Sequence, residues 1–269
     1  MIIFIIPAYN EENNIGLLLE KTKKKMGELK YAYKAIVVND GSTDKTEEIV
    51  ESFKGQIPVK IISHYPNKGV KETFLIGFNA ALKIAADDDI IVTKEADNTS
   101  DLDILETMIE KVQNGTDIVL ASCYAKGGKV ENTTLGRIIL SWGANIFLKL
   151  YFFISGINTY SSFYRAFNAG SLKRAFSAYD GKLLTLDGYV VVVEMLIKLS
   201  RLSISIVEVP MVLYCDRRKG ASKMKKYQTI IGYLKLVWYD LWRDRKFGKE
   251  VLKRYSVSAP LKHVDNIDY

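Results

Sequence analysis

Cysteine, histidine and proline are scarce in this chain of 269 residues. Five prolines and 18 glycines leave no low-complexity linker, and a composition of 48% hydrophobic and 26% charged residues excludes a disordered, collagen-like or disulfide-scaffold protein. The two cysteines, Cys123 and Cys215, fit no CxxC metal spacing and favour reduced thiols over a single disulfide. The two histidines, His64 and His263, provide neither a histidine metal cluster nor a catalytic triad.

Hydrophobic runs of transmembrane quality are also missing. The apolar N-terminus, Met1–Ile6, lacks a basic segment and stops at Pro7, so it is interpreted as a buried strand and not as a signal peptide. The nearest candidate for a membrane span, Ile138–Tyr164, contains Lys149 and several Ser, Gly and Asn residues. We therefore expect no spanning helix.

The positive charge of the chain is concentrated in one segment. Asp216–Arg254 holds 13 Lys and Arg against 4 Asp and Glu, a net charge of +9, whereas the remainder of the chain carries −2. Such a segment favours a polyanionic partner, which could be a phosphate group, an anionic membrane surface or nucleic acid. A solvated basic surface is the alternative.

Strand and helix patterns alternate over the first 120 residues. The expected strands are Ile2–Ile6, Ala35–Val38, Val59–Ile62, Ile90–Thr93 and Ile118–Ala121, and the expected helices are Asn10–Met26, Asp44–Phe53, Lys71–Ala86 and Leu102–Asn114. This alternation predicts an α/β fold with a mostly parallel, Rossmann-like sheet. Beyond residue 122 the sequence predicts a helix at Leu135–Ile154 and strands at Ser203–Val209 and Met211–Tyr214.

The loops after these strands carry the polar residues. Ligands bind beyond the carboxyl ends of parallel strands, which draws attention to the loops Pro7–Glu12, Asn39–Asp44, His64–Lys71 and Lys94–Asp101. The chain contains no GxGxxG after its first strand and no GxxxxGK[ST], which argues against a nicotinamide dehydrogenase and a P-loop NTPase.

Two of these loops suggest specific chemistry. Asp40 could accept hydrogen bonds from a base or a ribose, although its loop also suits an ordinary strand-to-helix turn. Glu95 and Asp97 are separated by one residue, so their carboxylates could share a divalent cation with substrate phosphates. A charged surface loop is the alternative there.

The second half adds a basic loop and an amphipathic helix. Asp216–Lys223 combines four basic residues with a glycine, which suits the clamping of a phosphate. The helix expected at Tyr227–Arg243 carries Tyr, Trp and aliphatic residues on one face, which is typical either of a membrane-interface helix or of a core-facing helix. Glu194 is a lone acid in an apolar helix, either structurally paired or functional.

Taken together, these motifs resemble the family 2 glycosyltransferases of GT-A fold. The matching segments of the first half are Pro7–Glu12, Val37–Asp44, Asn67–Gly69 and Glu95–Asp97. The second half resembles the polyprenyl-phosphate branch, which includes the dolichol-phosphate mannosyltransferases. Its matches are Tyr124 with Gly127 and Gly128, Arg137, Ser141, Tyr160–Ala166, Glu194–Leu196, Glu208–Pro210 and Asp216-Arg217 with Gly220, Ser222 and Lys223.

The resemblance implies roles for individual residues. The donor side, which binds the nucleotide sugar, would comprise Pro7, Tyr9, Glu11, Asp40, Lys68, Ala96 and Lys223 together with the acidic pair. Glu95 and Asp97 would hold Mg²⁺ or Mn²⁺ at the diphosphate, with Asp97 counted among the catalytic residues. Arg137, Ser141 and Arg217 would meet the acceptor phosphate.

The implied reaction is transfer of a hexose, with inversion, from a nucleotide sugar to a polyprenyl or dolichyl phosphate. GDP-mannose is the donor favoured by the resemblance. Since the acceptor phosphate is already anionic at neutral pH, no general base is assigned. The protein is expected on the cytoplasmic face of a membrane, peripherally or with a membrane-anchoring subunit, and nucleic acid is not an expected partner. The expected division is a GT-A domain (1–222), an interface helix (223–245) and a tail (246–269).

Three positions depart from the family pattern. Glu95 stands where Asp is usual, Thr99 where Gln is common, and Cys123 where an Arg precedes the tyrosine. A family 2 enzyme with another donor, such as UDP-glucose, or with a non-lipid acceptor is the alternative among enzymes. The three departures leave open a catalytically impaired subunit that regulates a partner.

Overall fold

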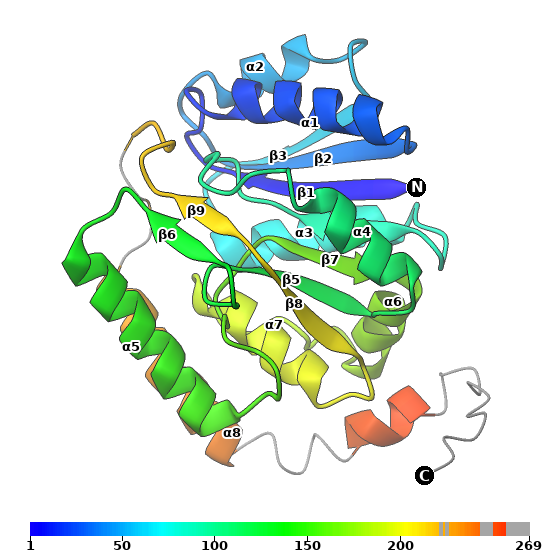
Figure 1. Ribbon diagram of the computed structural model, residues 1–269. Helices are drawn as coiled ribbons and strands as arrows, with labels where there is room; N and C mark the ends of the chain where they lie inside the picture. Colours follow the sequence, from blue (N-terminus) through cyan, green and yellow to red (C-terminus); the bar gives the residue numbers. More distant parts are fainter. Residues whose placement is uncertain (221–222, 224–225, 243–249, 257–269) are drawn as a thin grey trace.

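Seven strands form one mixed sheet in the computed structural model, which describes residues 1–220, 223, 226–242 and 250–256 (Figure 1). The strand order is β3-β2-β1-β4-β7-β5-β8, and β7 is antiparallel to both of its neighbours while every other pair is parallel. The strands are β1 (Ile2–Ala8), β2 (Tyr33–Asp40), β3 (Val59–His64), β4 (Ile90–Thr93), β5 (Ile118–Ser122), β7 (Arg165–Asn168) and β8 (Ile206–Pro210).

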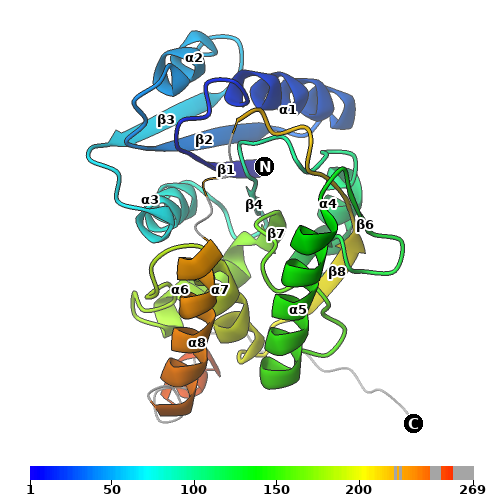
Figure 2. The same cartoon turned by 90° about the vertical axis from the view of Figure 1, so that its left-hand side faces the viewer.

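Helices cover both faces of the sheet, which gives three layers (Figures 1 and 2). Successive side chains of a strand point to opposite faces, so Ile2, Phe4 and Ile6 belong to one buried cluster and Ile3 and Ile5 to the other. The first cluster includes residues of α1 (Ile15–Leu29), α2 (Thr46–Ser52) and α4 (Leu105–Gln113), and the second includes residues of α3 (Val70–Leu82), α6 (Ala169–Ala178) and α7 (Val190–Ser200).

Strand β7 is one of the elements that the sequence pattern did not reveal, together with β6 (Lys129–Glu131) and α6. It inserts between β4 and β5, and its first residue, Arg165, is fully buried. The guanidinium of Arg165 donates to the carbonyl oxygens of Tyr160 (3.0 Å) and Ser162 (2.8 Å), and burial lowers its pKa to about 9. Arg165 therefore fixes the turn that leads into β7.

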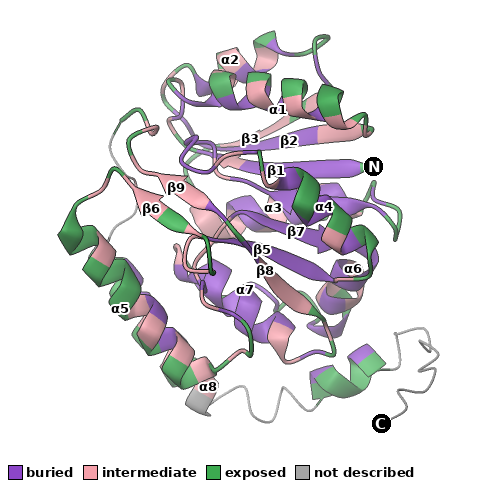
Figure 3. Cartoon of the chain, in the orientation of Figure 1, coloured by how far each residue is buried: buried purple, intermediate pink, exposed green. Residues whose placement is uncertain are grey.

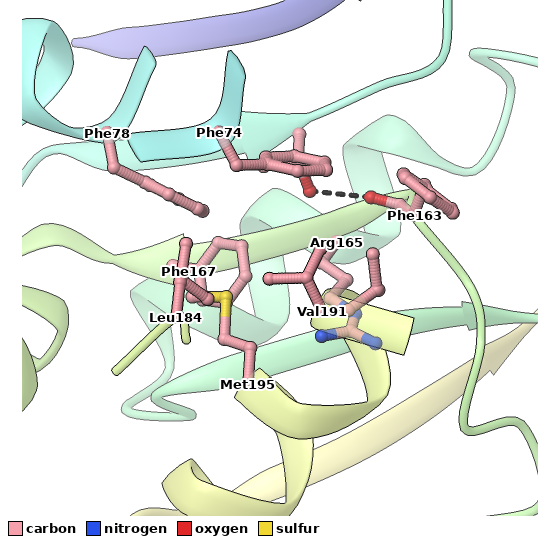
Figure 4. A pocket seen from close by; sticks show the side chains of 10 residues that line it. Phe74, Phe78, Phe163, Arg165, Phe167, Leu184, Val191 and Met195 are labelled. Carbon is pink, nitrogen blue, oxygen red and sulfur yellow. Dashed lines mark hydrogen bonds between the residues drawn. The ribbon is translucent and has the colours of Figure 1, made fainter. Parts of the chain in front are cut away.

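The cavity beside Arg165 is part of the hydrophobic core. Figure 4 shows it between Phe74 and Phe78 of α3 and Val191 and Met195 of α7. Its volume is about 10 Å³, which holds no more than about one water molecule. No substrate fits there.

A second, two-stranded sheet and two long helices stand at one side of the molecule (Figure 2). β6 (Lys129–Glu131) pairs in parallel with β9 (Val212–Tyr214). The helices α5 (Leu135–Phe152) and α8 (Lys226–Trp242) lie side by side below the sheets. The Tyr214 amide donates to the Thr99 carbonyl (2.7 Å), which fastens the end of β9 to the loop after β4.

Most of the expected elements are confirmed with shifted bounds. The first helix begins at Ile15 and not at Asn10, because Asn10 has a left-handed φ of 52° and belongs to the loop after β1. The apolar segment starting at Leu135 is a helix, and among the described residues no helix has the length and apolar character needed to cross a bilayer. Of the expected tail, 246–249 and 257–269 lie outside the described residues, and 250–256 are helical.

Candidate active site

The end of β2 organises the first loop of the site. The buried Asp40 carboxylate accepts hydrogen bonds from the backbone amides of Lys68 (2.7 Å) and Gly69 (3.0 Å). Gly41 has a φ of +68°, and a Cβ there would lie 2.6 Å from the Asn67 amide nitrogen, so only glycine suits this turn. Asp40 therefore holds residues 67–69 against the carboxyl end of β2.

The carboxylate pair follows β4. Lys94 turns into the core, where its ammonium donates to Ser100 Oγ (2.6 Å) and burial lowers its pKa. Glu95 lines a cavity, and burial together with the charge of Asp97 raises its pKa to about 7. The two acids therefore interact electrostatically at the carboxyl end of β4.

Asp97 is saturated with hydrogen bonds. Its Oδ1 accepts from the Thr99 amide (3.0 Å) and hydroxyl (2.7 Å), and its Oδ2 accepts from Nε (2.8 Å) and Nη2 of Arg218. Burial acts to raise the pKa of Asp97, but the Arg218 charge and these hydrogen bonds hold it below its usual value.

The basic loop lies across this edge of the sheet. The Lys219 amide donates to Asn14 Oδ1 (2.9 Å), and Asn14 Nδ2 returns a bond to the Lys219 carbonyl (2.9 Å). Lys223 pairs with Glu11 (2.5 Å). Arg217 pairs with Asp101 and stacks on the Tyr214 ring at 3.6 Å. The loop thus connects the segments that follow β1 and β4.

A cavity of about 290 Å³ opens beside the acids, between α5 and α8. Its polar lining includes Glu95, Arg137, Ser141 and Arg218. The Tyr124 hydroxyl donates to Ser141 Oγ (2.9 Å). Much of the remaining wall is apolar, with contributions from Ile138, Leu140, Leu148, Ile230 and Tyr233. The cavity combines cations and a carboxylate with an apolar passage between two helices.

The structure brings most of the expected site residues to one edge. Glu95, Arg137 and Ser141 share the cavity, and Asp97 adjoins it through Arg218. Of the expected donor residues, Pro7, Tyr9, Glu11 and Asp40 lie at the carboxyl ends of β1 and β2. Lys68 is in the loop after β3, where its amide binds Asp40, and Lys223 is on the basic loop, where it pairs with Glu11. The side chain of Ala96 is buried in the apolar cluster, and that of Arg217 does not line the cavity.

Arg218 is the site residue that the sequence analysis did not single out. The resemblance rested on Arg217, and two adjacent arginines in a loop carry no periodicity that tells which one turns inward. Asn14 was also missed, because an asparagine near a helix start is usually interpreted as a cap. Ser222, part of the basic motif, lies outside the described residues.

Glu194 belongs to the core and not to this site. Its carboxylate pairs with the buried Lys198 (2.6 Å) and accepts from the amides of Thr185 (2.8 Å) and Leu186 (2.9 Å). Lys198 also donates to the Lys182 carbonyl (2.7 Å). These contacts support the interpretation of Glu194 as a structurally paired acid of the core and not as a functional residue.

Replacing Lys198 with Met is expected to destabilise the fold by about 3 kcal/mol, because it leaves the Glu194 charge buried and unpaired. Urea unfolding measures this. The matched control is Lys173→Met, whose partner Asp87 is exposed, with an expected loss below about 1 kcal/mol. Equal losses in the two variants would contradict a buried ion pair.

The oxygen atoms at and around Asp97 are of the type that binds a hard divalent cation. Among the described residues no three His, Cys, Asp or Glu side chains cluster as a metal site. The candidate ligands are the carboxylates of Glu95 and Asp97 and the Thr99 hydroxyl, which are all oxygens, although both Asp97 oxygens accept hydrogen bonds from Thr99 or Arg218 in this structure. Mg²⁺ commonly binds through one or two carboxylates and completes its shell with substrate phosphates and water.

Known proteins resemble this chain in sequence. The family model described as glycosyl transferase family 2 matches residues 3–176. The dolichol-phosphate mannosyltransferase of Pyrococcus furiosus is 32% identical over 87% of this chain, which spans 62% of that relative's length. The polyprenol monophosphomannose synthase of Mycolicibacterium smegmatis is 28% identical over 82% of this chain, and the match covers 79% of that relative's length.

Solved structures show the same fold. Glucosyl-3-phosphoglycerate synthase from Mycobacterium tuberculosis, in complex with Mn²⁺, UDP and glucosyl-3-phosphoglycerate, superposes with a TM-score of 0.59 at 17% identity. The match covers 88% of this chain and 80% of that one. The same enzyme with Mn²⁺ and UDP-glucose gives a TM-score of 0.60.

Proposed function

Because the chain belongs to glycosyl transferase family 2 and is a glycosyltransferase of GT-A fold, we propose that it transfers a hexose from a nucleotide sugar to a polyprenyl phosphate. GDP-mannose is the favoured donor, in keeping with the mannosyltransferase names of its relatives. The observation that carries the proposal is the cavity in which an acid of the β4 loop faces arginines within an apolar passage.

The donor side uses the acids at the edge of the sheet. Glu95 and Asp97 would hold Mg²⁺ or Mn²⁺, which neutralises the charge developing on the nucleoside diphosphate. Asp40 keeps residues 67–69 in place, and Glu11, in the loop after β1, pairs with Lys223 of the basic loop. These contacts shape a wall for the nucleotide at the position where α/β sheets bind ligands.

The acceptor side uses the cavity. A lipid phosphate entering between α5 and α8 meets the cations of Arg137 and Arg218 and the hydroxyl of Ser141. One phosphate oxygen attacks the anomeric carbon while the bond from that carbon to the diphosphate breaks, which inverts the configuration. The phosphate needs only to be positioned, since it is anionic before the reaction.

The exposed apolar residues of α5 and α8 support binding to a membrane surface. Figure 3 shows that much of α5 is exposed. Large apolar side chains reach exposures of 80% at Leu150 and 84% at Tyr227. They include Leu135, Ile139, Trp142 and Leu150 on α5 and Tyr227, Leu234 and Trp238 on α8. Within α8, Leu236 is buried, so the helix packs on the protein with one side and exposes the other.

In this proposal residues 223–245 attach a catalytic domain of residues 1–222 to the cytoplasmic face of a membrane. The net charge of +9 on the segment 216–254 would attract the protein to anionic headgroups. Helix α5 takes part in the same interface in this proposal. The sequence analysis had assigned the membrane interface to the C-terminal helix alone.

Cosedimentation with anionic liposomes tests the interface. The double variant Trp142→Ser/Trp238→Ser is expected to lower the partition coefficient at least about tenfold, because two large apolar side chains leave the interface. The control is Ile84→Ser, an exposed apolar residue after α3, which should bind as the wild type does. Wild-type protein that stays in the supernatant would refute the interface.

Equilibrium binding of GDP and UDP, each with Mn²⁺, tests the donor. The proposal expects the protein to bind GDP more tightly than UDP. Selective binding of UDP would overturn GDP-mannose and favour a UDP-sugar, while leaving the family assignment unchanged.

A further inference from the structure

Arg218 occupies the carboxylate oxygen of Asp97, Oδ2, that a metal ion would need as a ligand. Oδ1 of Asp97 is bonded to Thr99, and Oδ2 receives two N–H groups of Arg218. A divalent cation reaches Oδ2 only after the guanidinium has left it. The Arg218 side chain is 28% exposed, so it has a route out of the contact.

The contact also fixes the position of the basic loop. On one side of Arg218, Arg217 pairs with Asp101, and on the other side the Lys219 backbone exchanges two hydrogen bonds with Asn14. Among the described residues of this loop, Arg218 both touches Asp97 and lines the cavity with Arg137 and Ser141. Its guanidinium therefore stands between the proposed cation site and the proposed acceptor site.

We propose that Arg218 serves as the resident cation of Asp97 and that a divalent ion displaces it, which frees its guanidinium for a phosphate group in the cavity. A divalent ion neutralises the two carboxylates by itself, without the charge of the arginine. The released guanidinium becomes surplus positive charge next to the cavity, where planar two-pronged hydrogen bonding suits a phosphate. The proposal rests on the metal-assisted part of the proposed function.

Binding of Mn²⁺ alone, without nucleotide, tests this displacement. Electron paramagnetic resonance of free Mn²⁺ gives the affinity of the wild type, Arg218→Gln and the control Lys219→Gln. Lys219 has the same charge in the same loop, its side chain is exposed, and its two hydrogen bonds with Asn14 use the backbone. Arg218→Gln is expected to bind Mn²⁺ at least tenfold more tightly than the wild type, Arg218→Lys to fall between them, and Lys219→Gln to match the wild type.

Deuterium exchange of the peptide spanning 214–220 gives a second readout. Mn²⁺ should increase exchange in the wild type, and Arg218→Gln should show that increase without Mn²⁺. Equal Mn²⁺ affinity in Arg218→Gln and Lys219→Gln, or exchange that Mn²⁺ does not change, would overturn the proposal. Neither measurement depends on sugar transfer to a lipid. If the polyprenyl phosphate proves not to be the acceptor, the Mn²⁺ affinities and the exchange rates can still be interpreted.

Discussion

Replacing Asp97 with Ala is expected to lower the rate of sugar transfer by about three orders of magnitude. The carboxylate would hold the cation that stabilises the leaving diphosphate, and such charge stabilisation is worth several kcal/mol in the transition state. Asp97 is buried, accepts four hydrogen bonds and lies at the carboxyl end of β4. The measurement is kcat with saturating nucleotide sugar, polyprenyl phosphate and Mn²⁺.

Two variants separate the carboxylate from its partner. Asp101→Asn removes a neighbouring acid that pairs with Arg217, and it should retain most of the activity. Arg218→Gln removes the partner of Asp97 and keeps the acid, so binding of Mn²⁺ should persist in Arg218→Gln and be lost in Asp97→Ala. Near wild-type turnover by Asp97→Ala would rule out a metal role for this residue.

Replacing Arg137 with Gln is expected to raise KM for the polyprenyl phosphate by about 10-fold to 100-fold, while KM for the nucleotide sugar stays unchanged. The guanidinium lines the cavity with Ser141, and a hydrogen bond to a charged group contributes about 1.5–3 kcal/mol. Initial rates at varied acceptor concentration measure the effect.

The control for Arg137 is Lys149→Gln, which removes the same charge from the far end of α5. Lys149 donates to Asn158 and does not line the cavity. Arg217→Gln should have a smaller effect than Arg137→Gln, since Arg217 is paired with Asp101 and stacked on Tyr214. A defect confined to the donor KM in Arg137→Gln would contradict an acceptor role.

The sheet was largely predictable because most of its strands are visible in the sequence as uninterrupted apolar runs. Runs such as Ile2–Ile6 and Ile118–Ala121 are apolar without interruption, as strands covered on both faces must be. The carboxyl ends of parallel strands meet at one edge, so the loops that carry Asp40 and Asp97 were expected at the same edge of the sheet.

Strand β7 could not be predicted in the same way. Its four residues, Arg165–Asn168, place a charged side chain in the core, where backbone carbonyls of the preceding turn satisfy it. Its antiparallel position between β4 and β5 depends on contacts with residues far away in sequence. No local pattern carries that information.

The choice between Arg217 and Arg218 shows the same limit at the site. Both belong to one basic loop, and the resemblance favoured Arg217. The direction of each side chain depends on how β9 and the Asn14–Lys219 contact orient the loop. The chemistry of the loop was predictable from composition, whereas its geometry required the fold.

Transfer of labelled sugar into the organic phase tests the central claim most directly. Purified protein with Mn²⁺ and a polyprenyl phosphate is offered radiolabelled GDP-mannose, UDP-glucose and other nucleotide sugars in parallel. We expect organic-phase label from GDP-mannose that requires both the lipid phosphate and an intact Asp97. No transfer from any donor to the lipid, with the protein folded and bound to liposomes, would contradict a polyprenyl-phosphate glycosyltransferase and favour an inactive regulatory subunit or a different acceptor.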